Sequence, residues 1–331
     1  MIRIHFTYRH VDKPWGGANN FIRALHRKLS QDGRFRFTES IADDCDIIFM
    51  NQLAQGPAGG TQPVSLERVR ELMRRSDGAR KLVVRAVNLN LHAFSRGLRN
   101  LTVGWWNDRK TIALMNLADV AIFQSAYQRD FFVRAGYQPG KDVVIHNGAD
   151  VSFWTDAPAT SPLKGPLRFF SSTASPRATK RHDLIAQLSL IDDVEVTHVG
   201  VWPDALDPQR VRRLGMQPRE RLVEAMAASD LLFHPAVKDP CPNSVFEAMC
   251  MGLPVVYHPG PGSSSEIVGS CGLPLNESQL RETVDHARRD LPMLRQAVAS
   301  RRQLFSIDHA AARYCSVFER LARAGATECV E

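Results

Sequence analysis

Residues 239–256 read Asp239-Pro-Cys-Pro-Asn-Ser-Val-Phe-Glu247-Ala-Met-Cys-Met-Gly-Leu-Pro-Val-Val256. A Pro-rich loop leads into an apolar helical pattern, which stops at Gly252 and is followed directly by a strand-like run. Loop, helix and strand in this order are typical of an α/β sheet. The first helical turn directs backbone N–H groups at whatever lies in front of it, a natural site for an anion. Glu247, one turn further, can accept hydrogen bonds from hydroxyl groups. A site for a phosphate beside a site for hydroxyl groups suggests a nucleotide-sugar.

The same alternation of strand and helix extends over the whole chain. Short apolar runs predict strands at 2–8, 45–50, 81–87, 120–123, 143–146, 167–171, 194–199, 231–234 and 254–257. Helix-period segments lie at 18–30, 66–75, 109–117, 126–135, 182–190, 219–228 and 244–251, and 279–324 is mostly helical. This order predicts doubly wound parallel sheets.

The stretch 156–166 contains three of the chain's prolines together with Ser, Thr and Gly, which is typical of a linker. We therefore expect a first domain over 1–155, a second over 167–308, and a C-terminal helix over 309–331 that can pack back on the first domain. Two open α/β domains joined in this way place a ligand between them, at the carboxyl ends of the strands.

Composition excludes several classes. The 331 residues are 44% hydrophobic and 23% charged, as in a globular protein, and no uninterrupted apolar run is long enough for a transmembrane helix. The N-terminus enters a strand pattern with no signal-peptide core, so we expect a cytoplasmic protein. The six cysteines form no C-x-x-C pair and predict reduced thiols, without a disulfide framework or a metal site.

The positive charge is concentrated in the first half. Residues 1–150 hold 22 Lys and Arg against 14 Asp and Glu, whereas residues 151–331 hold 20 against 21. A basic face attracts anionic lipid, nucleic acid or acidic small molecules, although it can also be a solvated surface with no partner. No module of interleaved basic and aromatic residues is visible, so we do not expect nucleic-acid binding.

Four motifs resemble one known family. These are Asp239-x7-Glu247 with its apolar tail, Gly262-Ser-Ser-Ser-Glu266, the Asn-Gly-Ala-Asp150 stretch of 144–153, and Leu117-Ala-Asp-Val-Ala-Ile-Phe-Gln-Ser125. In order and spacing they are similar to the retaining GT-B glycosyltransferases, in particular glycosyltransferase family 4. The resemblance covers roughly residues 117–275 and implies two Rossmann-like domains with the active site in the cleft between them.

The resemblance implies roles for the central motif. Asp239 stands where the family has Glu and would contact the transferred sugar as a catalytic residue, unless it only caps the next helix. Backbone N–H groups of Asn243, Ser244 and Val245 would bind the sugar or the β-phosphate, and Asn243 can also be the helix N-cap. Glu247 would hold the ribose hydroxyls.

Basic residues after the first strand of the second domain would neutralise the pyrophosphate. Arg177 and Lys180 are the residues that we predict for this role, with Arg181 as a further candidate; a solvated cluster of charge is the alternative. Ser263, Ser264, Ser265 and Glu266 form a secondary donor-site segment, unless the serines only cap a helix.

Two candidates lie in the first domain. The Gly16-Gly17 pair resembles the family's glycine loop above the donor, where the absence of a side chain allows close approach of the backbone, although a plain strand-to-helix turn is the alternative. His92 is the candidate catalytic histidine that contacts the transferred sugar, but its surroundings do not reproduce the family pattern, and a structural or exposed histidine fits equally.

The implied activity is metal-independent transfer of a sugar from a UDP-, GDP- or ADP-sugar, with retention at the anomeric carbon and no cofactor. The acceptor would be a hydroxyl of a glycan or lipid-linked molecule in envelope polysaccharide or glycolipid assembly, and the basic half could contact an anionic membrane on its cytoplasmic face. The alternatives are a non-catalytic nucleotide-sugar or glycan-binding module and a nucleotide-sugar 2-epimerase of the same architecture.

Overall fold

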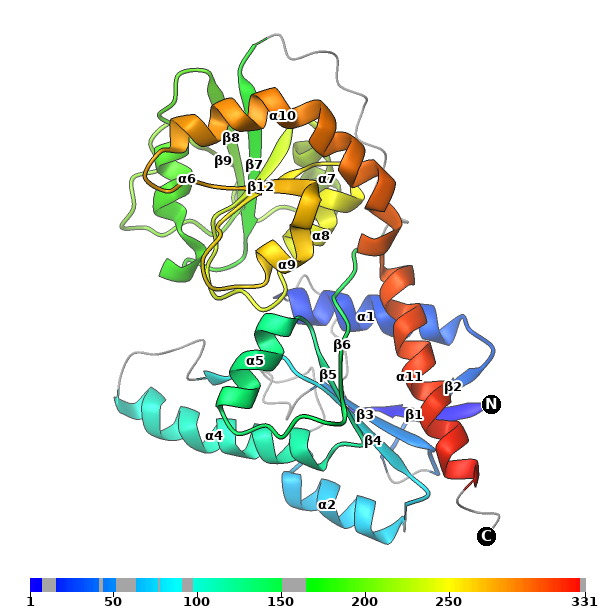
Figure 1. The fold of residues 1–331 in the computed structure, drawn as a ribbon. Coiled ribbons are helices and arrows are strands. Elements are labelled where there is room, and N and C mark those ends of the chain that lie inside the picture. The colour runs from blue at the N-terminus through cyan, green and yellow to red at the C-terminus, as the bar shows by residue number, and fades with distance from the viewer. Residues whose placement is uncertain are drawn as a thin grey trace. The chain divides into compact units, whose positions relative to one another are not determined.

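The computed structural model describes residues 1–7, 16–41, 44–51, 64–76, 78–90, 98–150 and 165–327. The chain divides into two compact units, a first formed by Met1–His146 with Ile307–Glu331, and a second formed by Asn147–Ser306. Each unit is built on a six-stranded parallel sheet with helices on both faces (Figure 1). The doubly wound α/β fold predicted from the alternation is therefore confirmed.

The first unit has the strand order β2-β1-β3-β4-β5-β6. Its strands are β1 (Ile2–Phe6), β2 (Phe35–Phe37), β3 (Ile47–Asn51), β4 (Lys81–Arg85), β5 (Val120–Phe123) and β6 (Asp142–Val144). Its helices are α1 (Gly16–Ser30), α2 (Leu66–Arg75), α4 (Leu98–Leu117), α5 (Ala126–Arg134) and α11 (Ile307–Thr327).

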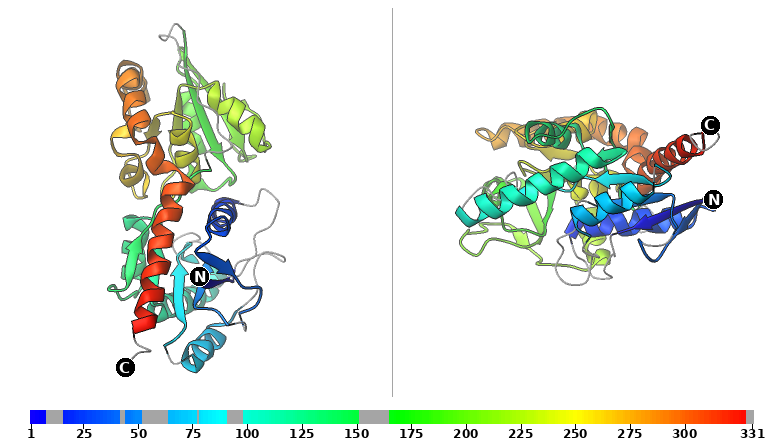
Figure 2. Two further views of the ribbon diagram at one scale, coloured as in Figure 1. Left: turned by 90° about the vertical axis from the view of Figure 1, so that its right-hand side faces the viewer. Right: turned by 90° about the horizontal axis from the view of Figure 1, so that it is seen from below.

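The strand side chains of this unit point alternately to two apolar layers, because successive residues of a strand face opposite sides of a sheet. Phe49 packs with α1 and α11, whereas its neighbour Ile48 packs with α2, α4 and α5. Thus α11, the last helix of the chain, contributes Tyr314 and Phe318 to the core of the first unit. Figure 2 shows α11 along the sheet formed by the N-terminal strands.

The second unit has the order β12-β11-β10-β7-β8-β9. Its strands are β7 (Leu167–Thr173), β8 (Val194–Gly200), β9 (Arg212–Arg213), β10 (Leu231–His234), β11 (Val255–Tyr257) and β12 (Gly272–Pro274). Its helices are the 3-10 turn η2 (Ala178–Lys180), α6 (His182–Leu188), α7 (Arg219–Ala227), α8 (Asn243–Cys250), α9 (Ser264–Val268), η3 (Gly269–Cys271), α10 (Leu280–Arg301) and η4 (Arg302–Phe305).

The order of the second sheet reverses between β7 and β10. The chain runs outward from β7 through β8 to β9, then crosses to β10 and continues through β11 to β12. In open parallel sheets a ligand binds beyond the carboxyl ends of the strands at such a switch point. The loops that follow β7 and β10 therefore border the expected binding site.

The opposite, amino ends of β7 and β10 are fixed by a buried carboxylate. Asp230 is fully buried and accepts two hydrogen bonds from the Arg168 guanidinium, each of 3.0 Å, and one of 2.9 Å from Arg295. Since a buried charge needs partners, these arginines allow Asp230 to lie there. The two strands that flank the switch point are thus tied together at the end away from it.

Several elements differ from the sequence-based predictions. The strands β2, β9 and β12 were not predicted, because runs of two or three residues carry no readable period. Helix α4 begins at Leu98, eleven residues before the predicted start, and the C-terminal helical stretch is divided at η4. The predicted linker lies mostly in 151–164, outside the described residues.

Cys45, Cys241, Cys250, Cys271 and Cys315 are free and buried. Across the described ranges, the structure contains no helix with both the length and the apolar character needed to cross a membrane.

Candidate functional site

An ion pair joins the two loops at the switch point. Lys180 Nζ lies 2.6 Å from Asp239 Oδ2, and the two side chains are 25% and 13% exposed. Lys180 ends η2 after β7, and Asp239 lies in the loop after β10. Burial and the lysine act in opposite directions on the Asp239 carboxyl, and its pKa is lowered, so the group is ionised at neutral pH.

Both partners of this ion pair lie next to a residue with left-handed backbone. Arg181 has a φ of 52° and Lys238 a φ of 58°. Non-glycine residues rarely adopt this conformation, because Cβ then crowds the backbone. The Lys238 N–H donates to the Pro261 carbonyl at 2.5 Å, which ties this loop to the one after β11. The fold therefore accepts backbone strain on each side of the site.

Further hydrogen bonds fix the Asp239 backbone and carboxylate. The Cys241 N–H donates to Asp239 Oδ1 at 3.2 Å, while the N–H and hydroxyl of Ser263 donate to the Asp239 carbonyl at 3.0 and 3.1 Å. The N-cap of α8 is Pro242, so Asp239 does not cap that helix. The alternative that Asp239 is only a capping residue is therefore wrong, and Ser263 supports the loop.

The start of α8 is held by a residue from the Asn-Gly-Ala-Asp150 motif. Asn147 is buried and donates from Nδ2 to Asn243 Oδ1 at 2.8 Å, and its N–H contacts Cys241 Sγ at 3.4 Å. Asn243 is the first helical residue, not the N-cap. The Val245 N–H donates to the Pro242 carbonyl at 3.1 Å. Helix geometry leaves the first N–H groups, including that of Ser244, without partners inside the helix.

Glu247 lies one turn into α8 and is partly buried. Burial raises the pKa of its carboxyl, and the charge of Arg219 opposes that effect. Arg219 opens α7 and donates from Nη2 to the Asp150 carbonyl at 3.3 Å. A partly desolvated carboxylate of this kind gains from hydrogen-bond donors that a ligand brings.

His234, the last residue of β10, was not predicted as a site residue. It is 5% exposed, burial lowers its pKa to about 4, and the charges of Asp239 and Lys180 both act on it. Within the described residues its Nε2 atom has no hydrogen-bond partner. A polar residue that ends a buried strand at the carboxyl edge of a parallel sheet is a signal that could have identified it.

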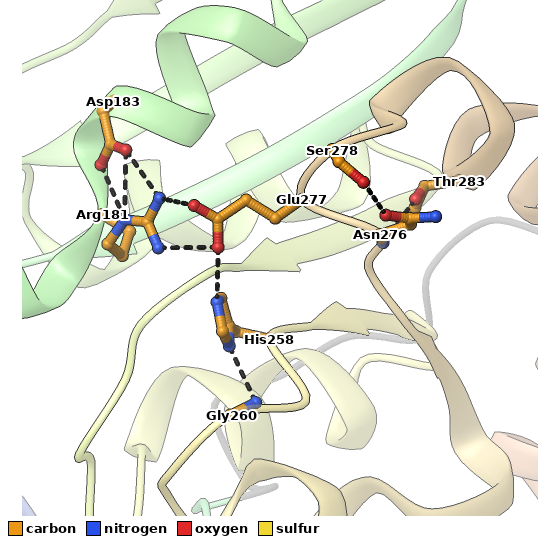
Figure 3. Close-up of polar contacts among 8 residues, drawn as sticks. All are labelled: Arg181, Asp183, His258, Gly260, Asn276, Glu277, Ser278 and Thr283. Carbon is orange, nitrogen blue, oxygen red and sulfur yellow. Dashed lines mark hydrogen bonds and ion pairs between the residues drawn. The ribbon is translucent and has the colours of Figure 1, made fainter.

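Arg181, a candidate for the pyrophosphate, has other partners in this structure. Its guanidinium donates to Asp183 Oδ2 at 2.8 Å and forms two bonds with Glu277, one of them 3.1 Å long (Figure 3). These bonds, with one from His258, lower the pKa of Glu277 to about 2. Since the Gly260 N–H donates to His258 Nδ1 at 2.8 Å, His258 donates to Glu277 from Nε2. Arg181 therefore connects the segment that follows β7 to the loop that follows β12.

The remaining basic candidate, Arg177, is exposed and precedes η2, so it lies on the same short turn as Lys180. In the serine segment, Ser264 is buried and its hydroxyl has no hydrogen-bond partner among the described residues. Ser265 and Glu266 are exposed on α9.

The two candidates in the first domain are the Gly16-Gly17 pair and His92. Gly16 and Gly17 form the first turn of α1, so they lie inside the start of the helix and not in a loop before it. His92 lies outside the described residues.

The first unit also gathers polar groups at the carboxyl ends of its central strands. Arg85, at the end of β4, is fully buried and donates to Asn51 Oδ1 and Gln124 Oε1, both at 2.7 Å. Its guanidinium also stacks on the Phe21 ring, 4.7 Å from the centroid. The sequence did not single out this residue, because an arginine at the end of a strand is usually solvated.

No group of three or more His, Cys, Asp or Glu side chains that could hold a metal ion occurs among the residues that the structure describes.

Comparisons with known proteins agree with the fold of the two units. Residues 169–290 match the family described as Glycosyl transferases group 1, and no curated protein matches the chain. Sucrose-phosphate synthase from Thermosynechococcus elongatus has a similar structure, with a TM-score of 0.70, 14% identity, and coverage of 98% of this chain and 100% of that chain. Anabaena HepE, solved with UDP and glucose, gives a TM-score of 0.68 and 17% identity, over 97% of this chain and 100% of that chain. Residues 169–290 of the second unit are therefore similar to the glycosyl transferases group 1 family, within a chain that has the GT-B fold.

Proposed function

We propose that this protein is a glycosyltransferase that moves a sugar from a nucleoside-diphosphate sugar to a hydroxyl of a glycan or lipid-linked acceptor. The observation that carries the proposal is the Lys180–Asp239 ion pair at the β7/β10 switch point, beside the start of α8. In this proposal the Lys180 cation would bind a diphosphate and the Asp239 carboxylate a sugar, beside the N-terminus of α8.

The proposed roles follow from charge and position. A diphosphate bound at the start of α8 would contact Lys180, which also pairs with Asp239. The positive charge of Lys180 would neutralise the diphosphate as it leaves. Because Asp239 is ionised at neutral pH, its carboxylate would accept from a sugar hydroxyl and stabilise positive charge that develops at the anomeric carbon. Glu247, on the next turn of α8, would accept from the ribose hydroxyls.

We further propose retention at the anomeric carbon, without a metal. The departing phosphate, held by Lys180, would accept the proton of the incoming hydroxyl on the same face of the sugar. The positive charge that a metal could supply is then contributed by Lys180, with Arg177 on the same turn as a second cation. A role in envelope polysaccharide or glycolipid assembly belongs to the same proposal.

UDP-sugars are the first donors to test, because HepE structures contain UDP and UDP-glucose. The purified protein would be incubated with UDP-, GDP- and ADP-sugars, and both nucleoside-diphosphate release and melting temperature would be measured. We expect one nucleotide to raise the melting temperature and its sugar conjugate to be hydrolysed slowly. Stabilisation without release supports the binding module, and recovery of a 2-epimerised sugar supports the epimerase. If no nucleotide stabilises the protein, the proposal is wrong.

A further inference from the structure

Helix α4 carries an unusual exposed aromatic surface. Val103, Trp105 and Trp106 are 53%, 41% and 61% exposed. The other large hydrophobic side chains exposed among the described residues are scattered singly, as is normal for a soluble surface. Three exposed hydrophobic side chains within four positions, two of them tryptophan, form a contiguous patch, and such a patch is typical of a binding surface.

The patch is bordered by positive charge. Arg109 and Lys110 are exposed one turn further along α4, and the Arg109 guanidinium lies 4.7 Å from the centroid of the Trp105 ring. At 100° per residue, Val103, Trp106 and Lys110 fall on one side of the helix. Asp108, the one acidic residue of α4, is 6% exposed and accepts from Asn90, so it does not offset this charge at the surface.

Helix α2 extends the basic surface. It lies beside α4 on the same face of the first sheet, as the view from below in Figure 2 shows. Four arginines of α2 are exposed, against the two acidic residues Glu67 and Glu71: these are Arg68, Arg70, Arg74 and Arg75. The surface that α2 and α4 present together is therefore net positive.

We infer that the exposed surface of α2 and α4 docks on a membrane that contains anionic phospholipid. Tryptophan is favoured at the boundary between headgroups and acyl chains, where its ring is buried and its N–H stays hydrated. Adjacent Lys and Arg side chains contact anionic headgroups. The tryptophan side chains and the basic side chains together give a reversible attachment. Attachment here would hold the first unit at the membrane whatever donor the second unit binds.

A glycan fits this surface less well. Sugars also stack on tryptophan, but Arg109 already covers one face of the Trp105 ring, and a neutral sugar gains nothing from the arginines of α2. The basic rim has its complement in a negatively charged surface wide enough to span both helices.

Vesicle sedimentation tests the inference on the full-length protein. Wild type is expected to sediment with vesicles that contain phosphatidylglycerol, and to stay in solution with phosphatidylcholine alone or in high salt. Both Trp105→Ala/Trp106→Ala and Arg109→Gln/Lys110→Gln should bind at least tenfold more weakly. Arg212→Gln/Arg213→Gln removes the same charge from exposed positions on β9 and should bind like wild type.

Melting temperatures show whether each variant is folded, and the single substitution Trp106→Ser replaces the double variant if that one is unstable. A blue shift of tryptophan fluorescence on vesicle addition, lost in the Trp variants, is the second expected signal. Equal sedimentation of wild type and all variants overturns the inference. So does the absence of binding together with a concentration-dependent dimer that Trp106→Ser abolishes, because the patch is then a contact between copies of this chain.

Discussion

Lys180 Nζ contacts Asp239 Oδ2 at 2.6 Å, and this ion pair bridges the β7 and β10 loops of the second sheet. Removing one partner of a partly buried ion pair leaves the other charge uncompensated. This lowers the stability of the protein by more than the intact pair contributes. Variants at this pair therefore report on both stability and function, and each needs a control that separates the two.

Asp239→Asn is expected to slow sugar transfer by at least about 100-fold, because the developing positive charge loses its carboxylate. The Cys241 N–H still finds an amide oxygen, so the loop keeps its shape. The affinity for the nucleoside diphosphate should equal or exceed that of wild type, because the carboxylate is assigned to the sugar and Lys180 loses a competing anionic partner. Steady-state rates with the donor found in the panel, and calorimetric titration with its diphosphate, measure the two effects.

Asp183→Asn is the matched control, because it removes a carboxylate that pairs with the neighbouring Arg181. It should retain most of the activity. A fully active Asp239→Asn protein would remove Asp239 from the mechanism.

Glu247→Gln should abolish the recognition of the ribose hydroxyls. Wild type is expected to bind the ribonucleoside diphosphate at least tenfold more tightly than its 2′,3′-dideoxy form, because a carboxylate accepts strong bonds from two hydroxyls. The variant should show a difference below about threefold. Glu224→Gln, which breaks only an exposed pair with Arg221, should behave as wild type. Equal discrimination in Glu247→Gln and wild type would place the ribose elsewhere.

Lys238→Gly tests the backbone strain beside Asp239. At a φ of 58°, glycine removes the crowding of Cβ, but it also makes the unfolded chain more flexible. The free energy of unfolding of Lys238→Gly should therefore lie slightly above the wild-type value or within about 1 kcal/mol of it. Lys238→Val should lower it by at least about 1 kcal/mol, because a β-branched residue is least tolerated there. Denaturant unfolding measures both, and Lys238→Ala separates loss of charge from backbone strain. A valine variant as stable as the glycine variant would contradict the strain.

The stability of the second unit should fall in acid. His198 is fully buried on β8 among the rings of His182 and Trp202, and burial lowers its pKa from 6.5 to about 4. A folded pKa below the unfolded one means that this contribution is complete above pH 6.5 and is lost as the pH falls towards 4. The difference corresponds to roughly 3 kcal/mol.

His198→Leu should therefore flatten the fall in stability between pH 6.5 and 4, measured by denaturant unfolding at each pH. His309→Gln, an exposed histidine of α11, should leave the profile unchanged. If His198→Leu keeps the wild-type slope, other groups control the acid sensitivity.

The sequence predicted the fold, because the fold depends on local patterns, and the same patterns indicated which strand ends would carry the candidate site. Alternating strands and helices indicate parallel sheets, and the carboxyl ends of parallel strands share one edge. Lys180 and Asp239 are 59 positions apart, yet each follows a predicted strand, so their proximity could be inferred. Their direct contact could not, because it depends on the side-chain geometry of two irregular loops.

Other contacts had no local signal. Arg181 bonds to Glu277, which is 96 positions away and follows β12, a strand too short to predict. Asn147 was read as part of a motif, but its bond to Asn243 required the tertiary fold. As the polar residue at the end of an apolar strand, His234 could have been singled out, but its burial beside two charged groups depends on the tertiary fold.

In the proposed function, Lys180 binds the diphosphate of a nucleotide-sugar at this switch point. The most direct test is calorimetric titration of wild type and Lys180→Met with the nucleoside diphosphate and with the nucleoside alone. Wild type should prefer the diphosphate, and Lys180→Met should lose at least tenfold of that preference while its affinity for the nucleoside is unchanged. The same preference for the diphosphate in a folded Lys180→Met protein would show that Lys180 does not bind the diphosphate.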